Sequence, residues 1–106
     1  MTRKIARFFA DRRPETPCLV VDLDVIEDSY QKLARLLPLA KVFYAVKANP
    51  ESDVIERLNR LGSCFDTAST GEIELSRDKG VGPKRISFGN TIEKQRDIAG
   101  AYGKGV

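Results

Sequence analysis

The sequence contains no histidine and only two cysteines, Cys18 and Cys64, among its 106 residues. The missing histidine removes the usual zinc ligand sets and every triad or general base built on an imidazole. We therefore expect no metal site. We interpret both cysteines as small buried hydrophobic residues in a reducing compartment.

Long apolar runs and charge clusters are missing as well. No stretch approaches the roughly 18 to 20 apolar residues that span a bilayer, and the charged start of the chain does not fit a signal peptide. The net charge is only +3, and no run of Lys and Arg exceeds two residues. Composition therefore gives no support to binding of nucleic acid or a membrane, and predicts a cytoplasmic globular protein.

Apolar runs that alternate with helical patterns fill the chain from residue 17 onward. Residues 17–21 predict a short strand, and a helix follows with Asp24 as its candidate N-cap and Pro38 blocking its continuation. One face of that helix carries four apolar side chains: Ile26, Tyr30, Leu33 and Leu37. Residues 41–46 predict a second strand, covered on both faces because its apolar run is continuous.

Further helices and strands follow at short intervals. Residues 52–61 predict a helix, and Gly62 supplies the left-handed residue that often follows a helix end. The remaining elements are predicted as a strand over 64–66, a helix over 72–79 ending at Gly80, a strand over 85–88, and a helix over 91–102 capped by Thr91.

The middles of three predicted strands, at Val42, Cys64 and Ile86, recur every 22 residues. Such repetition of a strand and a helix predicts an α/β fold with a parallel sheet, either open and doubly wound or rolled into a (β/α)8 barrel. Because eight units need roughly 200 residues or more, we expect this chain to be a fragment. Its sheet would then keep an unpaired edge and a poorly covered face, which favours marginal stability or association.

Polar residues follow the predicted strands at the edge where loops form the site in both architectures. Lys47 ends the second strand in a setting expected to be semi-buried, where desolvation frees the amine as a nucleophile, as a Schiff-base lysine requires. Alternatively, Lys47 only marks where the strand reaches the surface. Asp66, Ser69 and Glu72 lie near the same rim, where carboxylates suit an ammonium group, although helix capping and turn formation also explain them.

Three blocks of sequence, taken together, carry a family resemblance. They read VFYAVKANP at 42–50, FDTASTGEIE at 65–74 and ISFGNTI at 86–92. In this order they resemble the ornithine/lysine/diaminopimelate/arginine decarboxylases of the alanine racemase-like fold. The resemblance implies the first three to four βα units of a partial (β/α)8 TIM-type barrel, with residues 1–15 as an N-terminal extension and 16–106 as part of the cofactor-binding barrel domain.

The resemblance also implies a cofactor and a site. Pyridoxal 5′-phosphate would be held by Lys47 as the Schiff-base lysine, Ala45 would line the pocket of the pyridine ring, and Asp66 and Glu72 would lie beside the lysine ammonium. The family's phosphate-binding loop, the carboxylate that pairs with the ring nitrogen and its C-terminal β-domain would lie beyond residue 106. We therefore expect residues 1–106 alone to be inactive.

The phrasing of the second and third blocks looks most like ornithine decarboxylase. It implies decarboxylation of L-ornithine to putrescine in polyamine biosynthesis, a small amino acid as substrate, and a homodimer in the full-length protein. Four alternatives remain open. They are a lysine, diaminopimelate or arginine decarboxylase, a non-catalytic relative that binds the cofactor, a pyridoxal-phosphate amino-acid racemase, and an α/β fragment whose Lys47 has no role.

Overall fold

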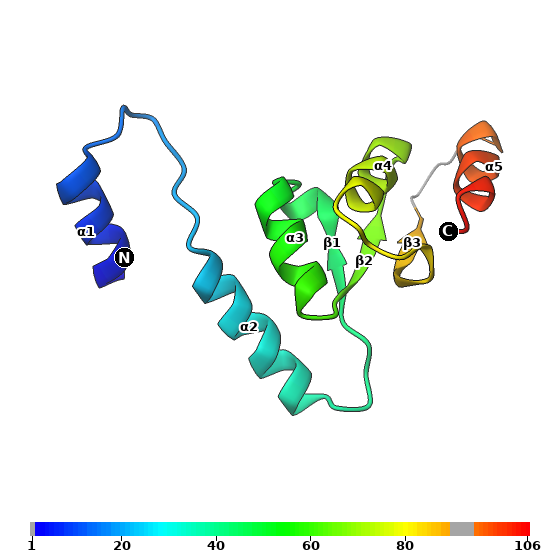
Figure 1. Ribbon diagram of the computed structural model, residues 1–106, viewed down its shortest axis with the longest axis horizontal. Coiled ribbons are helices and arrows are strands. Elements are labelled where there is room, and N and C mark those ends of the chain that lie inside the picture. The colour runs from blue at the N-terminus through cyan, green and yellow to red at the C-terminus, as the bar shows by residue number, and fades with distance from the viewer. Residues whose placement is uncertain (1, 90–94) are drawn as a thin grey trace.

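The structure is a computed structural model that describes residues 2–89 and 95–106. Its centre is a three-stranded parallel sheet in the order β1-β2-β3, with a helix between successive strands (Figure 1). The elements are α1 Arg3–Arg12, α2 Leu23–Leu36, β1 Phe43–Ala45, α3 Ser52–Arg60, β2 Cys64–Thr67, α4 Thr70–Asp78, β3 Ile86–Phe88 and α5 Gln95–Gly103, with 3-10 turns η1 Val46–Ala48 and η2 Pro83–Arg85. The predicted parallel α/β fold is confirmed.

The register of the sheet differs from the predicted alignment by one residue. Phe43 pairs with Cys64 and Phe65 pairs with Ile86, so partners lie 21 residues apart. Val42, Cys64 and Ile86 are therefore not partners, although they mark the same three strands. The difference matters because successive residues of a strand point to opposite faces.

The hydrophobic core lies on one face of the sheet, under α3 and α4. Phe65 at the middle strand is fully buried, and it packs with residues from both helices. The core consists of Val46, Val54, Ile55, Leu58, Phe65, Ile73, Val81, Ile86 and Ala101. On the other face Phe43 is 48% exposed and Asp66 is exposed. The prediction that residues 41–46 are covered on both faces is therefore wrong, because only one face has helices packed on it among the described residues.

Two helices end where the sequence predicts and one begins earlier. Gly62 and Gly80 follow α3 and α4 with φ of +93° and +86°, a backbone conformation that glycine adopts without strain. The helix predicted over 72–79 begins two residues sooner, because the Ser69 hydroxyl accepts a hydrogen bond from the Glu72 amide at 3.1 Å. The predicted cap of the last helix, Thr91, lies outside the described residues.

The segment before α2 departs most from the prediction. Residues 17–21 form no strand and run as a coil between α1 and α2 (Figure 1). A strand needs a hydrogen-bonded neighbour, and no described strand pairs with this segment, which is largely exposed to water. Cys18 is exposed in this coil, which contradicts its predicted burial, whereas Cys64 is buried as predicted. The N-cap of α2 is Asp22 and not Asp24, since Asp22 accepts a hydrogen bond from the Asp24 amide at 3.0 Å.

Helix α2 packs only part of its apolar face on the core. Ile26 and Tyr30 contact the core, while Leu33 and Leu37 remain exposed. The helix ends before Pro38, as predicted. Within the described ranges, no helix combines the length and apolarity needed to cross a membrane.

Charged side chains tie α1 and α3 to the start of α2. The Lys4 ammonium lies 3.0 Å from Asp22 and 2.6 Å from Asp24. Arg57 of α3 reaches Asp24 at 3.1 Å and Glu27 at 2.8 Å. We call these five residues the α1–α2–α3 ion-pair cluster. Helix α1 has no buried residue of its own, so this cluster is its main polar attachment.

Candidate active site

Lys47 lies in the turn η1, directly after strand β1. Its side chain is exposed, and no hydrogen bond or ion pair occupies its amine within residues 2–89 and 95–106. The predicted semi-buried setting is therefore wrong. The reason is that the apolar residues before Lys47 are covered on one face only, so the strand end faces solvent.

Side chains that pack in the hydrophobic core fix the backbone on both sides of Lys47. Val46 is fully buried, and the Tyr44 hydroxyl donates a 2.8 Å hydrogen bond to the carbonyl of Asn49. The Tyr44 ring packs edge-on against Phe65, with ring centroids 6.3 Å apart. Burial raises the pKa of Tyr44, so the phenol stays a donor at neutral pH. The turn is thus anchored on both sides of Lys47.

Asp66 lies on the neighbouring strand at the same end of the sheet. It pairs with Ala45 on β1 and with Ser87 on β3. The Ser87 hydroxyl donates a 2.8 Å hydrogen bond to the Asp66 carboxylate, which is exposed. Because Lys47 follows Ala45 by two residues, the structure brings Ala45, Lys47 and Asp66 to one rim.

Glu72 is engaged in capping helix α4. One of its carboxylate oxygens accepts a hydrogen bond from the Ala68 amide at 2.9 Å, while Ser69 caps the Glu72 amide. This reciprocal arrangement resembles a capping box. Across the described part of the chain, no hydrogen bond or ion pair joins Glu72 or Asp66 to Lys47. The structure thus accounts for Ser69 and Glu72 by capping, and a role of Glu72 beside the lysine stays a prediction.

The residues present fit a cofactor that is held through a primary amine. Within the described part of the chain the Lys47 amine has no ion-pair partner that would have to be displaced, and Ala45 and Ala48 on either side of it are small. An uncompensated lysine at a strand end that faces away from the core is accessible to an aldehyde. Pyridoxal phosphate therefore fits this rim through Lys47.

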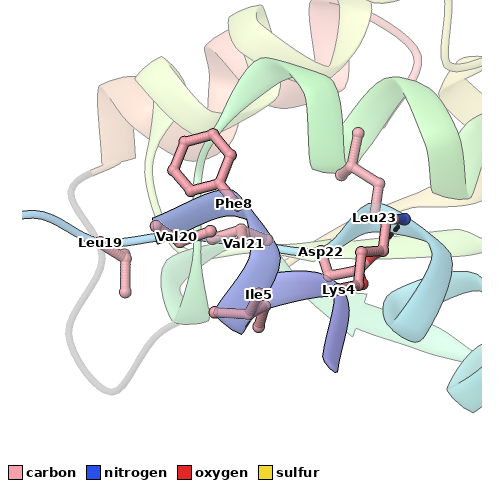
Figure 2. A pocket seen from close by; sticks show the side chains of 8 residues that line it. All are labelled: Lys4, Ile5, Phe8, Leu19, Val20, Val21, Asp22 and Leu23. Atoms are coloured by element: carbon pink, nitrogen blue, oxygen red, sulfur yellow. Dashed lines mark hydrogen bonds and ion pairs between the residues drawn. The ribbon is translucent and has the colours of Figure 1, made fainter. Parts of the chain in front are cut away.

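The pocket drawn in Figure 2 lies elsewhere in the molecule. It is formed between helix α1, which supplies Ile5 and Phe8, and residues 19–23. None of Lys47, Asp66 and Glu72 lines it. The candidate site is an open rim of the sheet rather than this apolar pocket.

Two residues with clear contacts at this rim were not predicted from the sequence. Tyr44 ties the turn around Lys47, and Ser87 contacts the Asp66 carboxylate. A repeat of 21 residues would have paired Asp66 with Ser87, whereas the 22-residue alignment pairs it with Phe88. For Tyr44 the alternation along residues 43–47 was a usable signal, because it places Tyr44 and Val46 on the face opposite Lys47.

Comparison with known proteins identifies the family. Residues 23–106 match the family model described as pyridoxal-dependent decarboxylase, pyridoxal binding domain. The chain belongs to this family. The family description names pyridoxal as the cofactor, and a solved relative described below contains pyridoxal phosphate.

Three relatives show the range of this similarity. The lysine/ornithine decarboxylase of Selenomonas ruminantium is 41% identical over 101 residues, which cover 95% of this chain and 25% of that protein. Antizyme inhibitor 2 of Xenopus laevis is 40% identical over 87 residues, covering 82% of this chain and 19% of that protein. A crystal structure of SrLDC with PLP and cadaverine matches with a TM-score of 0.84 at 38% identity, covering 98% of this chain and 27% of that one.

The chain thus spans about a quarter of the length of the relatives that it matches. The shared part includes the turn η1 that carries Lys47 and the strand β2 that carries Asp66, since the family match covers both.

Proposed function

We propose that the complete protein containing this chain is a pyridoxal-phosphate-dependent decarboxylase of a basic amino acid, with Lys47 as the Schiff-base lysine. The observation that carries this proposal is the position of Lys47 directly after β1, where its amine is exposed and has no ion-pair partner among the described residues. It lies inside the region that matches the pyridoxal-binding domain of the family.

L-ornithine, giving putrescine for polyamine biosynthesis, is the substrate we propose first. Support comes from the resemblance of the blocks at 65–74 and 86–92 and from relatives that act on ornithine and lysine by name. Lysine, diaminopimelate and arginine are the competing substrates. Each of these substrates has a positively charged α-amino group, which the negative Asp66 carboxylate at the rim would attract.

Bound pyridoxal phosphate supplies the electron sink that accepts the electrons of the bond to the leaving carboxylate. The residues of this chain would bind the cofactor and orient the substrate amine. The Lys47 amine would tether the cofactor, and a free Lys47 amine at this rim would also be placed to carry a proton. Ala45 leaves room for a planar ring beside it, and Asp66 holds a positive amine close to the rim by charge attraction. Glu72 adds negative charge at the start of α4 nearby.

The first prediction is that Lys47 is the one lysine of this chain that bonds covalently to the cofactor. Borohydride reduction of the complete protein with pyridoxal phosphate, followed by peptide mapping, should place the label on Lys47. Lys41, six residues earlier on the same segment, is the matched control, and Lys41→Ala should leave labelling unchanged. Label on Lys41 or Lys79 in the native protein would contradict the assignment.

A non-catalytic relative that binds the cofactor is the second candidate. The observation in its favour is the 40% identity to antizyme inhibitor 2, nearly the same as to a decarboxylase. The presence of Lys47 favours the enzyme. A CO2-release assay with ornithine and lysine separates the two candidates, because a carrier would be labelled at Lys47 without releasing CO2.

We also propose how the chain fits into the larger protein. Residues 1–15 would form an N-terminal extension, and residues 16–106 would form the first units of a (β/α)8 barrel. The parallel βα repeat and the uncovered sheet face support this, because further strands would cover that face. We propose a cytoplasmic homodimer for the complete protein, which gel filtration with light scattering can test.

A further inference from the structure

We propose that Tyr44 is a positioning residue for Lys47, because its hydroxyl closes the turn that carries the amine. This inference rests on the proposed function of Lys47 and assigns a task to a second residue of the same segment. The residues between the two ends of the hydrogen bond, from Tyr44 to Asn49, contain the whole of η1.

The contacts around Tyr44 make it a fixed point rather than a mobile side chain. Its ring is wedged beside Phe65 at 74° between the ring planes, and it lies with Ile26, Val54 and Leu58 in the groove between α2 and α3. Phe65 is fully buried in the middle strand. A hydroxyl held by a ring packed in this way reaches the Asn49 carbonyl at 2.8 Å with little loss of side-chain freedom.

The hydrogen bond from Tyr44 restricts the conformation of the turn, because few other interactions hold the described backbone there. Asn49 is extended with φ of −158° and ends the turn, and its side chain accepts a hydrogen bond from the Glu51 amide at 3.1 Å. Val46 anchors the turn by burial on the core side. The Tyr44 hydroxyl therefore joins the end of β1 to the start of α3, and Lys47 projects from the short loop between them.

A fixed turn restricts where the Lys47 amine can be. The amine nitrogen bonds to the aldehyde carbon of the cofactor and one water leaves, so the rate depends on how often the amine is correctly placed. Loss of the Tyr44 hydroxyl leaves the Asn49 carbonyl without this donor and widens the range of turn conformations. One neutral hydrogen bond corresponds to about a two- to twelvefold effect.

The experiment compares Tyr44→Phe with Tyr30→Phe in the complete protein. Tyr30 also contacts the core, and its hydroxyl makes no hydrogen bond in the described part of the chain, so Tyr30→Phe is a matched control. The measured quantities are the first-order rate of covalent cofactor capture at saturating pyridoxal phosphate, the half-saturating concentration, and the amide hydrogen exchange of residues 46–49. Capture is followed by absorbance and by borohydride labelling of Lys47.

We expect Tyr44→Phe to slow capture by about two- to twelvefold with an unchanged half-saturating concentration, and to speed exchange in the turn. Tyr30→Phe should change neither. Capture at the native rate, or exchange as slow as in the native protein, would overturn the role of Tyr44. If instead the native protein forms no bond at Lys47, the proposed function itself fails, so the two failures are distinguishable.

Discussion

Asp66 is exposed, and one of its carboxylate oxygens accepts a hydrogen bond from the Ser87 hydroxyl, while its other oxygen has no partner among residues 2–89 and 95–106. The other oxygen is available to an amine at the rim. If the complete protein has the function proposed above, a carboxylate placed there would act on the position and protonation of the Lys47 or substrate amine and not on the phosphate of the cofactor.

Asp66→Ala in the complete protein is therefore expected to slow turnover by about tenfold or more while cofactor affinity changes little, since a charge-assisted contact is worth about 1.5 to 3 kcal/mol. Turnover is measured by CO2 release, and cofactor affinity by titration. Asp78→Ala, at the far end of α4, is the control and should leave both values unchanged. A variant that loses the cofactor but turns over normally when resaturated would contradict the placement of Asp66.

The sequence could predict which residues reach the rim, but not their surroundings. Lys47 and Asp66 lie at strand ends, as their positions after apolar runs indicate. The burial of Lys47 was predicted wrongly because a continuous apolar run does not reveal which elements cover each face. The contact between Ser87 and Asp66 depends on a register that a one-residue error in spacing hides.

At the scale of single elements, the start of α4 depends on two side chains. Ser69 caps the Glu72 amide and Glu72 binds the Ala68 amide. Ser69→Ala should lower the free energy for opening α4 by about 1 kcal/mol, the usual value of an N-cap. Hydrogen exchange of the α4 amides in the complete protein measures it.

The control for this variant is Ser52→Ala at the start of α3. Ser52 makes no capping hydrogen bond within the described ranges, so its loss should change the opening of α3 by less than about 0.5 kcal/mol. Equal effects of the two substitutions would show that the Ser69 cap does not stabilise α4.

Helix α1 is attached through the α1–α2–α3 ion-pair cluster, and this attachment should depend on pH. The hydrogen bond to Lys4 is the largest cause that lowers the pKa of both Asp22 and Asp24. Groups with a lowered pKa stabilise the folded arrangement above their ordinary pKa, and the contribution is lost as pH falls through the lowered value. The same contacts raise the pKa of Lys4, so on the alkaline side the contribution is lost only as pH rises through that raised value.

Protection of the α1 amides against hydrogen exchange, corrected for intrinsic rates, should therefore be constant near neutral pH and fall below about pH 4. Lys4→Gln removes the shared cation and should flatten this acid limb. High salt should weaken protection in the native protein, because the side chains of Lys4 and Asp24 are exposed. An acid limb of the same size in Lys4→Gln would assign the pH dependence to other groups.

Helix ends were predicted correctly where a residue at the end itself limits the backbone conformation. Helix α3 ends just before Gly62 and helix α2 ends before Pro38, because glycine adopts a left-handed backbone conformation and proline cannot continue a helix. Residues 17–21 have the composition of a strand, yet a strand exists only with a hydrogen-bonded neighbour, which local sequence does not specify. Cys18 is exposed for the same reason.

The whole molecule is extended for its length. Its radius of gyration is 16.2 Å, compared with about 13 Å for a compact domain of 100 residues. Helix α1 and the coil after it reach away from the sheet (Figure 1). Apolar side chains such as Leu19, 84% exposed, and Leu39 remain in solvent. Much of the apolar surface of the chain is thus available for further contacts.

Residues 1–106 by themselves should release no CO2 from ornithine or lysine, even with excess cofactor. By the family resemblance, the residues that would contact the phosphate and the ring nitrogen are not expected among residues 1–106. Two charge-assisted contacts of about 1.5 to 3 kcal/mol each correspond to roughly two to four orders of magnitude in affinity. The purified chain is compared with the free cofactor. Sustained activity that Lys47→Ala abolishes would contradict this prediction.

The 21-residue register also has a consequence for how the chain folds. Each pairing of neighbouring strands joins residues only 21 positions apart, a loop short enough to close early in folding. Strand β2 takes part in both pairings, with β1 on one side and β3 on the other. The sheet can therefore assemble in chain order while the polypeptide is still being synthesised, β1 with β2 first and β3 after it. In this order of assembly, the face around Phe43 stays exposed after the three strands have paired.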